Sequence, residues 1–241
     1  MSRKRSPGWV PNQHGAWAML VTPLLVGVLA GGPAWVHLPL ALFWFLGYFA
    51  FFATGLWLKA RRKARYRPPV VAYGIGAGVA GLVVLALEPG LLRWTPLFIV
   101  PLGVGLVASA IRDERSLWSG IATTVGSSLM TVVAYDAGPG TDPDRAWLLA
   151  GVLAAYFAGT VFYVKTIIRE RDSEPHYWLS VGFHSLAMLA LIPVVPALTL
   201  VFAVLTARAA IVPAFRITPK QAGIGEIVLT TVVAVTALLV T

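Results

Sequence analysis

Apolar residues recur along the chain in runs of about 20 residues, separated by short stretches rich in glycine, proline and charge. A run of this length, as a helix rising 1.5 Å per residue, crosses a bilayer core about 30 Å thick. The pattern predicts an all-α fold, a polytopic bundle of about nine transmembrane helices. We expect these spans near residues 15–35, 38–58, 70–87, 91–111, 117–135, 147–168, 178–194, 196–212 and 224–240.

The weakest boundary in this pattern is the sequence PVVP at residues 193–196. A bundle of eight spans, with one helix continuing through that stretch, is the main alternative. In both cases we expect a single transmembrane domain over residues 1–241. The polar stretches, about a dozen residues at the longest, are too short to fold into a separate domain.

Basic residues gather in alternate connecting segments. With nine spans and a cytoplasmic N-terminus, all but two of the 19 Lys and Arg residues lie on the cytoplasmic side, the exceptions being Arg93 and Arg145. Cytoplasmic loops of membrane proteins carry such an excess of positive charge. The sequence therefore predicts a multi-pass protein of the cytoplasmic membrane with its C-terminus outside.

The overall composition supports the membrane prediction. The chain is 58% hydrophobic and 12% charged, against about 25% charged residues in soluble domains, and its mean hydropathy is +0.78. The net charge of +9 comes from basic residues whose distribution follows the predicted membrane topology. Membrane lipids are therefore the expected partners, and nucleic acid is not. The chain has no cysteine, which excludes disulfides and thiolate chemistry. The oligomeric state cannot be read from these features.

A glycine-rich stretch matches a nucleotide-binding pattern only by its letters. Residues 76–81 read GAGVAG, but they lie inside an apolar span with no strand before them, so the dinucleotide-binding interpretation fails. Gly74 and Gly78 form a G-x-x-x-G pair instead. Such a pair is expected to let two helices approach closely.

Polar side chains at the cytoplasmic ends of the spans are denser than anchoring requires. Arg208 lies inside an apolar run, and His184 lies about 9 Å past Trp178 along its helix. Ionisable residues within a membrane are costly and mark functional sites by default. The candidate ligand-binding residues are Gln13, His14, Trp17, Arg112, Lys165, Arg169, Asp172, His184, Arg208 and Glu226; the sequence assigns no catalytic residue and no metal ligand.

Each candidate also has a purely structural interpretation. Lys165 and Arg208 can extend to the interface, His184 can form an interhelical hydrogen bond, and Glu226 can complement a helix N-terminus. Lys165, Arg169 and Asp172 share one helix face only if that helix continues past the membrane. Considered one at a time, these residues leave both interpretations open.

Three segments resemble a known family. The sequences PNQHGAWAMLVTPLLVG at 11–27, YVKTIIRERD at 163–172 and ITPKQAGIGE at 217–226 are similar to the YwiC-like family of bacterial membrane proteins. The resemblance implies an integral protein of the cytoplasmic membrane and brings no established reaction with it.

A second, architectural resemblance is to the UbiA-type intramembrane prenyltransferases, which have nine helices and working loops after the second and sixth. RYRPPVVAYG at 65–74 and KTIIRERDSE at 165–174 occupy the places of those loops. These enzymes hold diphosphate through magnesium on Asp-rich motifs. Here the first motif is absent, since no Asp or Glu precedes Glu88, and the second is reduced to Glu170, Asp172 and Glu174. The resemblance therefore leaves Mg²⁺, and any cofactor, unassigned.

A cytoplasmic face rich in Lys and Arg suits an anion. Arginine presents a planar fork to phosphate oxygens, whereas lysine acts as a point charge. The leading hypothesis is a UbiA-like protein whose basic cytoplasmic-side cavity binds, and as an enzyme transforms, an isoprenoid or lipid phosphate. The alternatives are a transporter or flippase for an anionic metabolite and a non-catalytic accessory protein of a membrane complex. Whether the protein is an enzyme stays open.

Overall fold

The computed structural model describes residues 8–11 and 14–241, with side chains in the first helix from Ala16 onward. Over these residues the chain folds into nine α-helices and three short 3₁₀ turns, with no strand. The helices are α1 (His14–Gly31), α2 (His37–Lys59), α3 (Arg67–Leu87), α4 (Thr95–Ala110), α5 (Leu117–Asp136), α6 (Pro143–Ile168), α7 (Glu174–Leu191), α8 (Pro196–Ile211) and α9 (Pro219–Val240). The 3₁₀ turns are η1 (Ala64–Tyr66), η2 (Pro89–Trp94) and η3 (Val212–Ala214).

The helices confirm the prediction of an all-α polytopic bundle. Each expected span is covered by one helix, and α7 and α8 are separate helices on either side of the PVVP stretch. Within the described residues, seven helices are long and apolar enough to cross a membrane; α1 and α7 are the two that fall outside this set. The chain is therefore a multi-pass membrane protein.

Proline and hydroxyl side chains define where several helices begin. Proline occupies the first turn of α3, α4, α7, α8 and α9. Backbone N–H groups in the first turn have no acceptor within the helix, so the N–H that proline lacks is not needed there. Ser116, Ser173 and Thr218 cap α5, α7 and α9 by accepting a backbone N–H in the first turn. These local signals explain why the breaks in the apolar pattern become helix boundaries.

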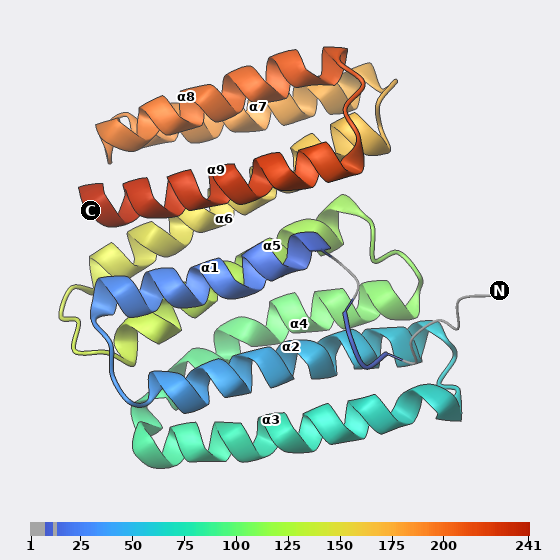
Figure 1. Cartoon of the computed structure of the whole chain (residues 1–241), viewed down its shortest axis with the longest axis vertical. Helices are drawn as coiled ribbons and strands as arrows, with labels where there is room; N and C mark the ends of the chain where they lie inside the picture. The colour runs from blue at the N-terminus through green and yellow to red at the C-terminus, as the bar shows by residue number, and fades with distance from the viewer. Residues whose placement is uncertain (1–7, 12–13) are drawn as a thin grey trace. The chain divides into compact units, whose positions relative to one another are not determined.

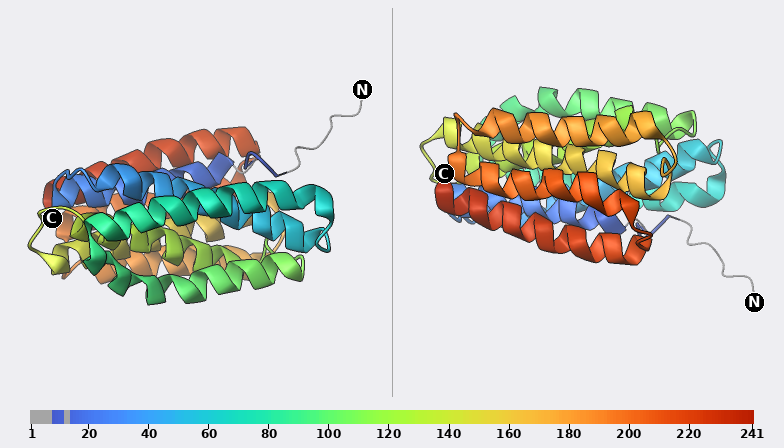
Figure 2. Two further views of the ribbon diagram at one scale, coloured as in Figure 1. Left: turned by 90° about the horizontal axis from the view of Figure 1, so that it is seen from below. Right: turned by 90° about the horizontal axis from the view of Figure 1, so that it is seen from above.

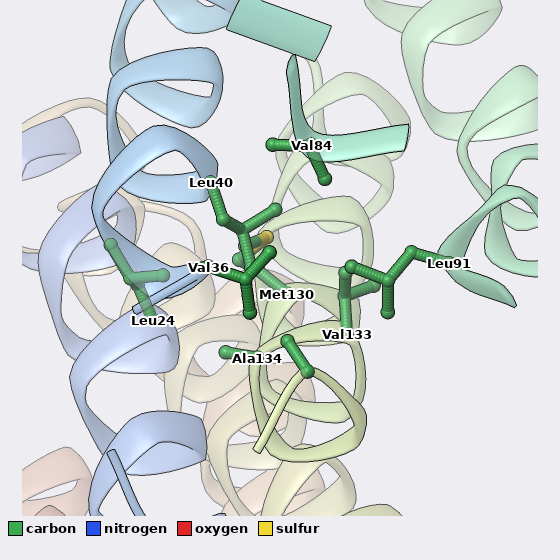
Figure 3. Packing of buried hydrophobic residues seen from close by; sticks show 9 residues of the cluster. Leu24, Val36, Leu40, Val84, Leu91, Met130, Val133 and Ala134 are labelled. Atoms are coloured by element: carbon green, nitrogen blue, oxygen red, sulfur yellow. The ribbon is translucent and has the colours of Figure 1, made fainter. Parts of the chain in front are cut away.

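The chain divides into two compact units, residues 1–146 and 147–241, with α6 beginning in the first and continuing through the second. The expectation of a single domain over 1–241 stays a prediction. In the first unit α2 packs against α3 and α4, while α5 packs against α1 and α4. A buried apolar cluster joins these helices (Figure 3); its members are Leu24, Val36, Leu40, Val84, Leu91, Met130, Val133, Ala134 and Ala137.

Glycine allows a close helix contact in the first unit, between α1 and α5. A Cβ added at Gly31 would lie 2.8 Å from the Cα of Tyr135, and one at Gly27 would lie 2.7 Å from the Cβ of Ala134. The expected role of Gly74 and Gly78 was wrong. Among the described residues, no atom lies within 4 Å of a Cβ built at either position, because this face of α3 points away from its neighbours.

In the second unit α7 packs against α8, and α8 against α9, and the helices run lengthwise beside one another (Figure 2). Helix α6 supplies many of its most buried side chains, including Tyr156, Phe157 and Ile167. An apolar cluster of Tyr163, Ile167, Ala209 and Ala222 closes the end where α6 stops and α9 starts. Side chains of α6 therefore form much of the core of this unit.

Basic residues collect at one end of each unit, because consecutive helices alternate in direction. In the first unit the α2–α3 and α4–α5 connections hold most of the arginines and lysines, and the opposite end holds Arg93 and Arg145. In the second unit the α6–α7 and α8–α9 connections hold Arg169, Arg171 and Arg216, whereas the α7–α8 connection carries no charge. Between these ends many large apolar side chains point outward, as lipid contact requires.

Candidate functional site

A shielded ion pair lies near the charged end of the second unit. Arg208, one turn before the end of α8, donates from Nη1 to Oε1 of Glu226, which follows the first two turns of α9. The exposed fractions of the two side chains are 10% and 14%. Removing two charges from water is costly, so a pair this shielded exists only where further groups satisfy it.

Helix α6 supplies those groups to the carboxylate. The hydroxyl of Thr160 donates to Oε2 of Glu226 at 2.8 Å, and the hydroxyl of Tyr156 lies 3.1 Å from the same oxygen. Thr230, one turn along α9, lies 2.9 Å from the Tyr156 hydroxyl. Glu226 is therefore fixed in place by side chains of α6 and α9, and its position orients the guanidinium that it binds.

The guanidinium of Arg208 is only partly used by these contacts. Its central carbon lies 4.0 Å from the ring centroid of Tyr163, so the aromatic ring covers one face. Nε and Nη2 are buried and have no hydrogen-bond partner among residues 8–11 and 14–241. These two atoms form the side-on edge of arginine, which matches two oxygens of a phosphate or carboxylate. We call it the Nε–Nη2 edge.

A buried histidine approaches the same turn of α6. His184 on α7 is 3% exposed, and its Nδ1 donates to the carbonyl of Ser180 at 2.7 Å. The other ring nitrogen, Nε2, is buried without a partner in the described part of the chain. It faces Gly159, where an added Cβ would lie 2.9 Å from it. Gly159 therefore makes room for the imidazole.

One face of α6 carries the whole arrangement. Tyr156, Gly159, Thr160 and Tyr163 follow the i, i+3, i+4, i+7 spacing of a single helix face. Sequence analysis singled out Arg208, Glu226 and His184 but missed these four residues. Their spacing was readable in the sequence. Hydroxyl groups and glycine within an apolar run nevertheless carry no charge signal that distinguishes them from packing residues.

The remaining candidates of the second unit lie at its charged end. Lys165 is half-buried in the last turn of α6, and Arg169 and Asp172 are exposed. Because α6 ends at Ile168, the helix does not include Arg169 and Asp172, and the expected common face of Lys165, Arg169 and Asp172 does not form. Ser173 caps α7 immediately afterwards, which explains why the chain turns there.

The first unit holds the other candidates. Trp17 is half-buried on α1 and packs edge-on against Phe49, with ring centroids 5.9 Å apart. Arg112 is exposed in the α4–α5 turn and has the left-handed φ of 64°. Gln13 lies outside the described residues, as does the side chain of His14.

A second ion pair, which sequence analysis missed, links two connections of the first unit. Lys59 at the end of α2 donates to Glu114 in the α4–α5 turn; the exposed fractions of the side chains are 42% and 22%. Burial alone would raise the pKa of Glu114, but the hydrogen bond from Lys59 and its positive charge hold that pKa below 4.5. Glu114 therefore has a structural role in this loop.

The described residues contain no group of three or more His, Asp or Glu side chains placed to hold a metal ion. Glu170, Asp172 and Glu174, the remnant of an Asp-rich motif, lie in the α6–α7 turn and at the start of α7. The chemistry that the site offers is therefore anion recognition by a guanidinium, beside a histidine nitrogen and several hydroxyl groups.

Comparisons with known proteins identify a family and relatives that cover most of the chain. Residues 10–135 match the model of a family described as YwiC-like protein. The chain is 32% identical over 178 residues to a Bacillus subtilis protein named "Uncharacterized protein YwiC", covering 73% of this chain and 74% of that protein. It is 28% identical over 238 residues to an "Uncharacterized protein" of Haemophilus influenzae, covering 96% and 98%. No solved structure gives a significant match.

Proposed function

The chain belongs to the YwiC-like protein family, and from this premise we propose that it binds the phosphate group of an isoprenoid or other lipid at Arg208, in the cytoplasmic membrane. The observation that carries the proposal is the buried Nε–Nη2 edge. A guanidinium in a low-dielectric site that leaves two donors unmatched is costly, and a ligand with two adjacent anionic oxygens removes that cost.

The neighbours of Arg208 prepare it for such a ligand. Glu226 holds Nη1 and Tyr163 covers one face of the guanidinium, so the side chain is ordered before any ligand arrives. Binding to a preordered group avoids most of the entropy cost of fixing a long side chain. The Nε–Nη2 edge therefore has the rigidity that bidentate phosphate recognition needs.

The depth of Arg208 favours a lipid head group over a soluble anion. The residue lies three positions before the end of α8, about 5 Å inside the helix terminus. The same end of the unit carries Arg169, Arg171 and Arg216. A phosphate at this level can contact Arg208 while its hydrocarbon chain stays among apolar helix surfaces.

The experiment measures binding of citronellyl phosphate, an isoprenoid monophosphate, and of inorganic diphosphate to the purified protein by calorimetry. Arg208→Lys keeps the charge but loses the edge, so we expect affinity for citronellyl phosphate to fall roughly 5- to 150-fold, the equivalent of about 1–3 kcal/mol for a charged hydrogen bond. Arg216→Lys, an exposed position of the same unit, is the matched control and should bind as the wild type does.

Two results would contradict the proposal. Equal affinity of Arg208→Lys and Arg216→Lys, with both folded by thermal melting, would leave Arg208 as a structural residue. Tighter binding of diphosphate than of citronellyl phosphate would point to a soluble anion instead of a lipid.

A further inference from the structure

We propose that His184 takes up a proton when the anion binds at Arg208, so that the site binds an anion and a proton together. This inference rests on the proposed function and adds its regulation by pH. Its structural basis is Nε2 of His184, which is buried against Gly159 and unpartnered within the described chain. Burying a polar atom without a hydrogen-bond partner costs free energy, and such atoms are retained where they have a functional role.

The tautomer follows from the hydrogen bond of the other nitrogen. Nδ1 contacts the carbonyl of Ser180 at 2.7 Å, and a carbonyl only accepts, so Nδ1 carries a hydrogen. In the neutral imidazole Nε2 is then a lone pair that can accept a proton. Gly159 keeps the space beside this lone pair free of a side chain.

The charge balance of the site supplies the reason for proton uptake. Arg208 and Glu226 form a pair with no net charge. An anion on the Nε–Nη2 edge makes the site negative, and a net charge in a water-excluded region is costly. A proton moving from bulk water to Nε2 of His184 restores neutrality.

The groups around His184 allow this coupling. Helix α8 contributes Arg208, whose positive charge interacts with the imidazole. Helix α9 contributes Glu226, which is tied to Arg208. Helix α6 meets the ring at Gly159, with Tyr156 and Tyr163 on the same face. An anion that offsets the charge of Arg208 therefore removes the repulsion between the guanidinium and a protonated His184.

Linkage gives the measurable consequence. If one proton binds with each anion, the affinity falls by up to about tenfold per unit rise in pH over the range where His184 is neutral in the free protein and protonated in the complex. A ligand that itself takes up protons near neutral pH would hide this effect. Citronellyl sulfate has the same hydrocarbon chain and a head group that stays a monoanion, so it is the appropriate probe.

The experiment is calorimetric titration of the purified full chain with citronellyl sulfate at about pH 7, in two buffers that differ in ionisation enthalpy. The difference in heat gives the number of protons taken up. We expect about one per ligand in the wild type and none in His184→Asn, whose amide still reaches the Ser180 carbonyl. His176→Asn is the matched control. It removes another buried histidine of α7, whose Nε2 lies 3.4 Å from the Phe162 carbonyl, and it should retain proton uptake.

Each result decides the inference separately from the proposed function. Arg208-dependent binding without proton uptake in the wild type overturns the inference and leaves the proposed function intact. Unchanged uptake in His184→Asn also overturns it. Failure of both citronellyl esters to bind overturns both proposals.

If His184→Asn does not fold, Gly159→Ala replaces it, because the added methyl group lies against Nε2 of His184. Proton uptake in Gly159→Ala should fall below the wild-type value, whereas unchanged uptake counts against His184.

Discussion

Arg208 and Glu226 are 18 positions apart in the chain and form a shielded ion pair, whose side chains have exposed fractions of 10% and 14%. By contrast, the side chains of the pair between Arg93 and Asp136 are 60% and 27% exposed. The two pairs share their chemistry but differ in solvent access. They therefore test how much of the stability of the second unit depends on burial.

Neutralising one partner of the shielded pair should be strongly destabilising. Glu226→Gln leaves the positive charge of Arg208 buried and uncompensated, and we expect the free energy of unfolding to fall by about 3–5 kcal/mol. Arg93→Gln, at the exposed pair, should cost less than about 1 kcal/mol. Denaturant titration of the purified protein measures both. Similar losses in the two variants would show that Arg208 has another counter-charge or is hydrated.

The pair of Lys59 and Glu114 predicts a pH dependence of stability. The pKa of Glu114 is lowered in the folded state from its ordinary value of 4.5, so its contribution to stability is complete above pH 4.5 and is lost as the pH falls through the lower, folded value. Glu114→Gln should therefore melt below the wild type at about pH 7, by the equivalent of less than about 1 kcal/mol. The two melting curves should converge in acid. A difference that persists unchanged below the folded pKa would assign the effect to packing.

The helices were predictable because each apolar run is interrupted by residues with a defined local effect. Proline in the first turn and the caps Ser116, Ser173 and Thr218 act within four residues of themselves, so the sequence alone indicates them. Arg208, His184 and Glu226 were also identifiable, since an ionisable residue inside an apolar run is conspicuous.

The partners of those residues could not be predicted in the same way. Thr160 meets Glu226 across 66 positions of sequence, a contact that exists only because α6 and α9 pack together. The predicted common face of Lys165, Arg169 and Asp172 does not form for a local reason. Ser173 and Pro175 begin a new helix too soon for α6 to continue. The helix contact expected at Gly74 and Gly78 is not formed within the described chain. Residue spacing indicates which residues share a face of a helix but not whether another helix covers that face.

The glycines of the first unit provide a packing test. A methyl group at Gly27 would clash with the Thr131 carbonyl and the Cβ of Ala134, so Gly27→Ala should lower the free energy of unfolding by about 1–3 kcal/mol. Gly74→Ala, in open space on α3, should be neutral or stabilising by up to about 1 kcal/mol, because alanine is the better helix former. Thermal melting of both variants in one detergent makes the comparison. A stabilised Gly27→Ala would refute the close contact of α1 with α5.

The segregation of charge in each unit predicts the orientation of the chain in the membrane. The connections that carry most of the basic residues should be cytoplasmic, because positively charged loops are retained on that side. A reporter fused after Arg67 should then read as cytoplasmic, and one fused after Thr241 as extracytoplasmic, since an odd number of spans places these sites on opposite sides. Moving the first reporter to Gly90, beside Arg93 in the α3–α4 connection, is the control and should reverse its reading. Reporters after Arg67 and Thr241 that read from the same side would contradict nine spans and require one of the helices α3 to α9 not to cross the membrane.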